Sequence, residues 1–260
     1  MNKQKTFITY WKRWWISVKN VIKNDEHVFI AGQTGSGKSF LKQAYLSGYK
    51  NVISLDLKGK LTYQPFLDNV PVIDNLDDLM QVGEGKYIYR PRFEEIETTE
   101  YVEKFFQWIY ERQNTICDID EIFALTEMGS RDGSYIPRYA KAILTRGRER
   151  QTTIWGATQR PKTIPMVYMS EATHFFIFSL KLEADRKRIQ ELIPHDEILE
   201  TIPKQTHKFW YYNDTMDRPQ KASMKINWSD TRKTIGEKLV QSDLDNKTNM
   251  KGWNENETRY

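Results

Sequence analysis

Short apolar runs alternate along the chain with longer segments in which apolar residues recur at helical spacing. The runs that we expect to form strands are residues 27–31, 51–56, 71–75, 86–89, 115–123, 151–158, 172–179 and 207–212. The segments that we expect to form helices are residues 40–45, 95–112, 138–150 and 182–192. Because strands and helices take turns, the pattern predicts an α/β fold with a mostly parallel central sheet flanked by helices on both faces.

The two ends of the chain differ from this middle part, residues 26–212, which we expect to form one domain. Residues 6–23 carry large aromatic and aliphatic side chains near helical spacing, which predicts an N-terminal aromatic amphipathic helix within residues 1–25. We expect this helix to dock on its own domain or on a neighbouring subunit rather than on a membrane surface, because an aromatic stripe at this spacing usually packs against protein. Residues 213–260 read as a polar C-terminal tail, partly helical or flexible, with one helix expected near residues 230–241.

The composition is that of a soluble protein. Hydrophobic residues make up 39% of the 260 residues, which allows a modest core, and no stretch is long and apolar enough to span a bilayer. The single cysteine, Cys117, excludes an internal disulfide framework and suits a reducing compartment. We therefore expect a cytoplasmic protein without stable insertion in a membrane.

Basic residues gather in two segments, although the formal net charge is only +4. Residues 1–24 contain six lysines and arginines and no acidic residue, and residues 138–162 contain seven with Glu149 as the one acid. Two such segments on a nearly balanced chain favour a polyanionic partner. For either segment alone, an ordinary solvated face remains the alternative.

The most specific motif is GQTGSGKS at residues 32–39, which fits the phosphate-binding pattern G-x-x-x-x-G-K-[ST] between a predicted strand and a predicted helix. Its glycines allow a backbone whose N–H groups point inward and bind an anion, and the helix N-terminus adds partial positive charge. Lys38 is expected to reach the β- and γ-phosphates of ATP, and the Ser39 hydroxyl to bind Mg²⁺. The predicted ATP-binding residues are Gly32, Gln33, Thr34, Gly35, Ser36, Gly37, Lys38, Ser39 and Phe40.

A second nucleotide motif is the sequence DIDE at residues 118–121, at the end of a predicted strand. Asp120 is expected to hold Mg²⁺ through water and so complement Ser39, and Glu121 to activate the attacking water as a general base. Asp118 is a rival for the metal, and we prefer Asp120 because the adjacent Glu121 supplies the base.

These two motifs, followed by RGRER at residues 146–150 and by TQRP at residues 158–161, resemble in their order the FtsK/HerA superfamily of P-loop motors. Within it, the chain looks most like the small viral DNA-packaging ATPases of phages, over roughly residues 26–190. The resemblance implies an additional-strand (ASCE, RecA-like) P-loop NTPase, with one strand inserted between the P-loop strand and the Asp-Glu strand. It also implies a homo-oligomeric ring, a pentamer or hexamer, around double-stranded DNA.

The resemblance also implies roles for individual residues. Gln159 matches the polar sensor of the γ-phosphate. Arg146 and Arg148 match the region that supplies an arginine finger to the neighbouring subunit; packaging enzymes favour Arg146 and the wider superfamily favours Arg148. The alternative is that these arginines bind DNA phosphates.

We expect the protein to differ from the members of this superfamily that carry a large nuclease domain or an N-terminal membrane-spanning region. A soluble motor of this kind suits ATP-driven translocation of double-stranded DNA that packages a viral genome into a preformed capsid. Its further partner would be a capsid portal or connector, which it would meet transiently in the host cytoplasm. Lys58, Lys60 and Arg131 lie in predicted loops that could contact the DNA backbone.

Two other functions remain open on the sequence alone. A conjugative or plasmid DNA-transfer ATPase of the same superfamily shares all the catalytic motifs. A membrane-associated phage-assembly NTPase would bind lipid through residues 7–22.

Overall fold

The computed structural model describes residues 8–12, 14–18, 22–96, 98–130, 134–226 and 240–245. Its centre is a sheet in which the strand order is β12-β11-β10-β9-β3-β8-β7-β4-β6-β5. The strands of this sheet are β3 (Val28–Ala31), β4 (Val52–Leu55), β5 (Val72–Ile73), β6 (Lys86–Tyr89), β7 (Ile116–Ile119), β8 (Thr153–Thr158), β9 (His174–Ile177), β10 (Lys208–Asn213), β11 (Gln220–Ile226) and β12 (Val240–Asp245).

The strands from β9 to β5 are mutually parallel, and β10, β11 and β12 continue the sheet in antiparallel pairs. Strand β8 lies between the P-loop strand β3 and the Asp-Glu strand β7. The additional-strand α/β P-loop fold predicted from the sequence is thereby confirmed.

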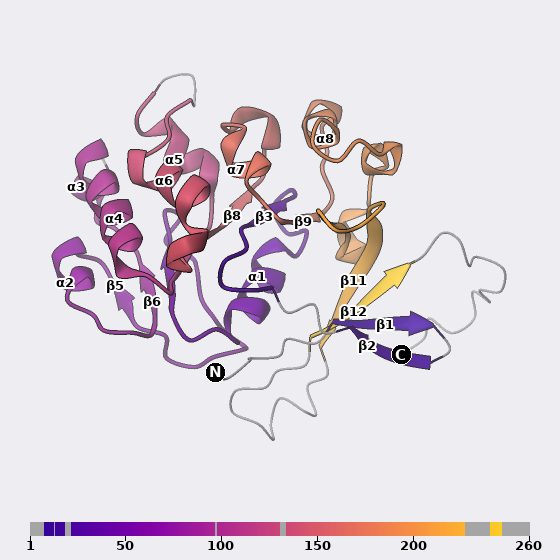
Figure 1. Ribbon diagram of the computed structural model, residues 1–260, viewed down its shortest axis with the longest axis horizontal. Coiled ribbons are helices and arrows are strands. Elements are labelled where there is room, and N and C mark those ends of the chain that lie inside the picture. The colour runs from indigo at the N-terminus through magenta and orange to yellow at the C-terminus, as the bar shows by residue number, and fades with distance from the viewer. Residues whose placement is uncertain are drawn as a thin grey trace.

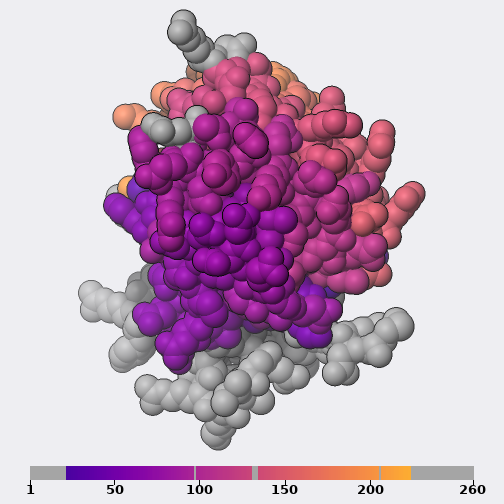
Figure 2. Space-filling view, turned by 90° about the vertical axis from the view of Figure 1, so that its left-hand side faces the viewer, coloured from indigo at the N-terminus to yellow at the C-terminus, as the bar shows by residue number. Residues whose placement is uncertain are grey.

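Helices cover both faces of the sheet (Figure 1). The helices are α1 (Lys38–Leu46), α2 (Leu76–Met80), α3 (Phe93–Ile96), α4 (Thr99–Arg112), α5 (Ile122–Glu127), α6 (Arg138–Arg146), α7 (Val167–Ser170) and α8 (Glu183–Gln190). Short 3-10 turns are η1 (Arg148–Arg150), η2 (Pro161–Thr163), η3 (Asp196–Leu199) and η4 (Lys204–Thr206). Helices α2 and α4 flank the sheet edge formed by β5 and β6, and this side of the molecule faces the viewer in Figure 2.

Alternate residues of each buried strand belong to two hydrophobic clusters, one on either face of the sheet. In β3, for example, Phe29 packs in the cluster beneath α4, α6 and α8, whereas Ile30 packs against α1. The α1 cluster is rich in aromatic rings: the Tyr45 ring centroid lies 6.0 Å from that of Trp155 and 5.7 Å from that of Phe176. These contacts fix α1, and with it the P-loop, on the sheet.

The prediction of an N-terminal helix within residues 1–25 is wrong. Residues Ile8–Lys12 (β1) and Trp14–Val18 (β2) instead form an antiparallel hairpin in which Ile8 pairs with Val18. The physical reason is that this segment is rich in tryptophan, tyrosine and β-branched residues, which favour strands, and this preference outweighs the approximate helical spacing.

The C-terminal part also differs from its prediction. Strand β11 pairs with β10, so the sheet continues beyond residue 212 into the segment expected to be a tail. Its sequence, QKASMKI, alternates polar and apolar residues as a half-buried strand does, and Ala222 is buried. Val240 and Gln241, placed at the end of a predicted helix, lie in β12, whereas residues 230–239 of that prediction lie outside the described residues.

Most other predicted elements are present with shorter bounds. The helix expected over residues 95–112 begins at Thr99, after the short helix α3. The strand expected over residues 115–123 ends at Ile119, and Ile122 already opens α5. Within the described residues, no helix combines the length and apolar composition that crossing a bilayer requires.

Candidate active site

The P-loop connects the end of β3 to the start of α1, as the motif predicts. Gly35 and Gly37 have φ angles of 75° and 108°, in the left-handed region that favours glycine. Lys38 folds back over the loop, and its Nζ donates to the carbonyl oxygens of Gly32 at 2.5 Å and Gln33 at 3.3 Å. Burial lowers the pKa of Lys38 to about 8.

The loop is fastened to the strands on both sides of β3. The Gly32 N–H donates to the Thr158 carbonyl at the end of β8, at 3.1 Å. Gln33 donates to Ser179, just beyond β9, through its backbone N–H at 2.8 Å and its side chain at 2.7 Å. Phe40, the last residue predicted to bind ATP, packs its ring 4.9 Å from that of Phe66. These bonds hold the loop rigid at the carboxyl edge of the sheet, where ligands of open α/β sheets bind.

Glu121 and Gln159, which are distant in sequence, meet beside the P-loop. Gln159 donates to the Glu121 carboxylate from its backbone N–H at 3.2 Å and from Nε2 at 3.1 Å. The same Gln159 side chain accepts a hydrogen bond from the Thr34 hydroxyl, at 2.6 Å. The Gln159 side-chain amide therefore connects Glu121, the predicted general base, to the phosphate-binding loop.

Lys58 also lies in this cluster. Its Nζ is 2.7 Å from Oε2 of Glu121, a carboxylate that is 4% exposed. The loop that carries Lys58 is held by Asp56, which accepts from the Lys60 and Leu61 N–H groups and from Arg90 Nε at 2.9 Å. Of the three residues predicted to contact DNA, Lys58 thus lies at the Glu121 carboxylate, Lys60 is exposed nearby, and Arg131 lies outside the described residues.

Lys42, which the sequence reasoning missed, is fully buried beneath the site. Its Nζ lies 2.6 Å from Asp118 Oδ1 and 3.3 Å from Asp120 Oδ1. Burial opposes the charge on Lys42, but the two aspartates outweigh burial and raise its pKa. The signal in the sequence was its position four residues after Lys38, which puts both lysines on the same inward face of α1.

The two aspartates of DIDE have different surroundings. The Asp118 side chain is completely buried against Lys42, whereas 14% of the Asp120 side chain is exposed toward the P-loop. Burial raises the pKa of Asp120, but the charges of Lys42, Lys58 and Lys38 outweigh it and lower that pKa. Asp120 is therefore the more accessible carboxylate of the pair, and its lowered pKa favours the ionised form.

The side chains at this edge match the chemistry of magnesium and a nucleoside triphosphate. The Ser39 hydroxyl and the Asp120 carboxylate are oxygen ligands, which Mg²⁺ prefers, and Mg²⁺ commonly takes only one or two protein ligands besides phosphate. The described residues contain no cluster of three or more His, Cys, Asp or Glu side chains that would hold a metal alone. Backbone N–H groups of a helix N-terminus and Lys38 are the groups that bind phosphate.

The predicted finger arginines, Arg146 and Arg148, lie at the opposite edge of the sheet, where β8 and β9 begin. Strand β8 runs six residues between the two edges, a distance of roughly 17 Å at about 3.3 Å per residue. Neither arginine can therefore reach the phosphate site of its own chain. The sequence prediction assigns these arginines to the site of a neighbouring subunit, and that role stays a prediction.

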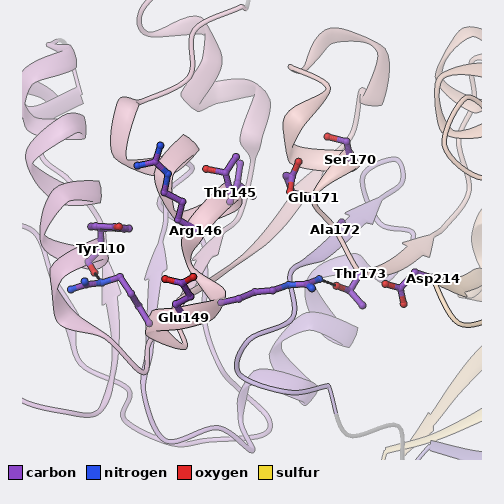
Figure 3. A pocket seen from close by; sticks show the side chains of 12 residues that line it. Tyr110, Thr145, Arg146, Glu149, Ser170, Glu171, Ala172, Thr173 and Asp214 are labelled. Carbon is purple, nitrogen blue, oxygen red and sulfur yellow. Dashed lines mark hydrogen bonds between the residues drawn. The ribbon is translucent and has the colours of Figure 1, made fainter.

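The arginines border a surface pocket of about 790 Å³, shown in Figure 3. Arg148 donates to the Thr173 hydroxyl at 3.1 Å, and Arg150 donates to the Tyr110 carbonyl at 2.7 Å and stacks on its ring. Arg146 is exposed and extends away from Glu149 and Thr173, with no hydrogen bond or ion pair to any described residue. Arg146 is thus the arginine whose guanidinium is available for a partner.

No protein family model matches the sequence, and no curated protein matches it. Several solved structures of other proteins are similar to this chain. The genome packaging NTPase B204 from Sulfolobus turreted icosahedral virus 2, in complex with AMPPCP, is similar over 77% of this chain and 98% of its own, with a TM-score of 0.59 and 16% identity. The DNA-packaging ATPase B204 from Sulfolobus Turreted Icosahedral Virus has a TM-score of 0.58 and 18% identity over the same shares of the two chains.

A third similar structure is the cytoplasmic domain of the Type VII secretion ATPase EccC from Thermomonospora curvata. It has a TM-score of 0.51 and 13% identity, and the match covers 84% of this chain and 28% of that one. At these identities the likeness concerns the fold. It confirms the predicted resemblance to the P-loop ATPases of the FtsK/HerA type at that level.

Proposed function

We propose that this protein is an ATP-driven translocase of double-stranded DNA that packages a viral genome into a preformed capsid. The observation that carries the proposal is the meeting of Lys38, Glu121 and Gln159 at one edge of the sheet. Gln159 is bonded both to Glu121 and to Thr34 of the P-loop, and Lys38 is bonded to carbonyl oxygens of the same loop. The packaging role is supported by a fold shared with a viral genome packaging NTPase. Contacts with DNA would be made to phosphates and so be independent of sequence and sensitive to salt.

In this proposal each residue of the edge has one task in ATP hydrolysis. The P-loop N–H groups and Lys38 bind the phosphates, and Ser39 and Asp120 hold Mg²⁺, which neutralises charge on the phosphates. Glu121 accepts the proton of the attacking water, and Gln159 transmits the state of the γ-phosphate from Thr34 to Glu121. Because Lys58 occupies Glu121 Oε2, its departure must precede proton transfer to that oxygen.

Arg146 would complete the site of a neighbouring subunit. The separation of the two sheet edges prevents Arg146 from reaching the phosphate site of its own chain, so a finger at Arg146 would come from a second copy. Repeating this heterologous contact around an axis closes a ring. A pentamer or hexamer around DNA, docked on a capsid portal, is the assembly that this function requires.

ATP hydrolysis with and without long double-stranded DNA, at low and high salt, tests the proposal. We expect DNA to stimulate hydrolysis at low salt, and Glu121→Gln to lower the stimulated rate by about 10²- to 10⁴-fold while ATP binding is retained. Arg92→Ala is the matched surface control, because Arg92 lies far from the P-loop and pairs with Asp74 on the surface. Hydrolysis that ignores DNA would refute the translocase.

Conjugative DNA transfer would use the same catalytic residues, and packaging of DNA into purified empty capsids distinguishes it from the proposed function. The membrane-associated alternative depended on an amphipathic helix at residues 7–22. Since β1 and β2 form a hairpin there, that support is removed. Stimulation of hydrolysis by lipid vesicles in place of DNA would restore it.

A further inference from the structure

A basic segment lies against the P-loop on the side away from the catalytic glutamate. It consists of residues 203–208, sequence PKQTHK, and includes the turn η4 just before β10. A Cβ atom on Gly35 would lie 3.3 Å from Lys204 Nζ, and one on Gly37 would lie 3.3 Å from His207 Nδ1. His207 Nδ1 is also 3.3 Å from the Ser36 carbonyl oxygen. Two basic side chains therefore touch two of the glycines that shape the phosphate-binding loop.

The sheet order determines which end of a bound nucleotide this segment would meet. Strand β3, which leads into the P-loop, has β8 on one side and β9 followed by β10 on the other. Glu121 and Gln159 lie on the β8 side, so the reacting γ-phosphate belongs there. A triphosphate that lies along the loop then directs its α-phosphate and nucleoside toward β9 and β10. That is the side on which Lys204 and His207 lie.

The chemistry of the segment suits an anion. It contains no acidic residue, and Lys204 forms no ion pair or hydrogen bond with its ammonium among the described residues. Both Lys204 and His207 are exposed, so a ligand can approach them from solvent. The backbone of His207 has a φ of 50°, in the left-handed region, and this turn presents its imidazole to the Ser36 carbonyl.

We propose that Lys204 binds the α-phosphate of the nucleotide, with His207 positioning the segment against the P-loop. The ligand class is a nucleoside di- or triphosphate, and the inference rests on the proposed function. Lys204 would form the nucleoside-side wall of a site whose other wall is Glu121 and Gln159. A contact with the α-phosphate is kept before and after hydrolysis, so it contributes to binding equally in the substrate and product states and leaves the chemical step unchanged.

The test compares binding of a triphosphate and a diphosphate. Isothermal titration calorimetry with AMPPCP and with ADP, each with Mg²⁺, is expected to show that Lys204→Met weakens both ligands by the same factor, about tenfold, as for loss of one charge-assisted hydrogen bond. Lys204→Arg should retain most of the affinity. The control is Lys104→Met, which removes an exposed lysine of α4 paired with Asp77 and should bind as the wild type does.

Several results would overturn the inference. A loss confined to AMPPCP would place Lys204 at the γ-phosphate, and equal affinities of wild type and Lys204→Met would remove it from the site. Wild-type protein that binds neither nucleotide would refute the proposed function as well. Binding by the wild type without DNA-stimulated hydrolysis would refute the translocase and leave the role of Lys204 standing.

Steady-state kinetics gives a second readout that a purely structural role would not produce. Lys204→Met should raise the KM for ATP by about tenfold and leave kcat unchanged, because uniform binding is lost. A fall in kcat at unchanged KM would contradict this. His207→Asn, whose side chain tolerates the left-handed backbone, should weaken both nucleotides by about threefold, as for a single neutral hydrogen bond. Unchanged binding would remove the positioning role of His207.

Discussion

The candidate functional side chains lie at two edges of the central sheet, and the two sets differ in whether they are bonded within the chain. At the carboxyl edge, Glu121, Gln159 and Lys58 are joined to one another, and Lys42 holds the aspartates beneath them. At the amino edge, Arg148 and Arg150 are bonded to their own chain, but Arg146 has no partner among the described residues. The carboxyl edge is thus a network of bonded side chains, whereas the amino edge presents Arg146 without a partner among the described residues.

This difference explains why the chain would work as an oligomer. The transition state of phosphoryl transfer gains strongly from an added arginine, and Arg146, at the amino edge, cannot supply it to the carboxyl edge of its own chain. Two edges of one molecule that complement each other make a heterologous contact, which gives a ring where the rotation between subunits closes. The proposed ring therefore follows from the position of Arg146 relative to the P-loop.

The largest expected effect on the difference between the two edges comes from removing the guanidinium of Arg146. Arg146→Ala is expected to lower DNA-stimulated hydrolysis by about 10³-fold or more, the usual value of an arginine finger, while nucleotide binding is retained. Adding this variant to wild type should reduce activity more steeply than dilution does, because each variant subunit disables its neighbour. ATPase assays over a series of mixing ratios measure this.

The matched controls for that experiment are Arg148→Ala and Arg150→Ala, which remove neighbouring arginines that are bonded within the chain. We expect them to lower stability more than they lower the catalytic rate. If Arg148→Ala abolished hydrolysis and Arg146→Ala did not, the finger would be Arg148, and its bond to Thr173 would have to open on assembly. If neither variant affected hydrolysis, the proposal of a trans finger would fail.

The carboxyl edge depends on its buried ion pairs in the same way. Lys42→Met leaves the buried carboxyl group of Asp118 without its partner in the interior, so we expect a loss of about 3–5 kcal/mol in the free energy of unfolding, measured by urea denaturation. The double variant Lys42→Met/Asp118→Asn removes both charges and should recover part of this loss. A loss below about 1 kcal/mol in the single variant would show that water reaches the pair.

Whether a feature of the site could be predicted from the sequence depends on whether it rests on local spacing or on contacts between distant segments. The P-loop, the DIDE motif and Gln159 depend on local spacing, and the alternation of strands and helices placed them at one edge. Lys42 could have been found from its spacing to Lys38. The contact of Lys58 with Glu121 could not, because it depends on how the loop after β4 folds around Asp56. The separation of Arg146 from the P-loop required the position of β8.

At the two ends of the chain, local patterns in the sequence were misinterpreted. Residues 6–23 fit a helical spacing and a strand composition at once, and the β-hairpin that forms there reflects the tryptophans and β-branched residues. In β11 the alternation of QKASMKI was visible in the sequence, but the polar character of the region concealed it. Where the spacing of apolar residues and the amino-acid composition favour different elements, the spacing alone does not predict which element forms.

The protonation of Lys38 gives a prediction of intermediate size. Because burial lowers its pKa to about 8, Lys38 loses its charge as the pH rises through this value, and the neutral amine attracts phosphate less. Affinity for MgADP should therefore be nearly constant below pH 7 and fall by about tenfold between pH 7 and 9. Calorimetric titrations at several pH values measure this, and Lys38→Met should remove the dependence. Constant affinity up to pH 9.5 would contradict the lowered pKa.

The smallest expected effect concerns the contact between Lys58 and Glu121 at the carboxyl edge. Lys58→Met removes the cation from Glu121 Oε2, which frees the carboxylate to accept a proton from water. Hydrolysis without DNA should rise several-fold, about the worth of one partly exposed ion pair, and the stimulation by DNA should fall by the same factor. Lys60→Met is the control from the same loop, because only the backbone N–H of Lys60 is bonded there. If Lys58→Met instead lowered hydrolysis to the level of Glu121→Gln, Lys58 would orient the base in the active state, and the carboxyl edge would already be set for catalysis before a neighbour's arginine arrives.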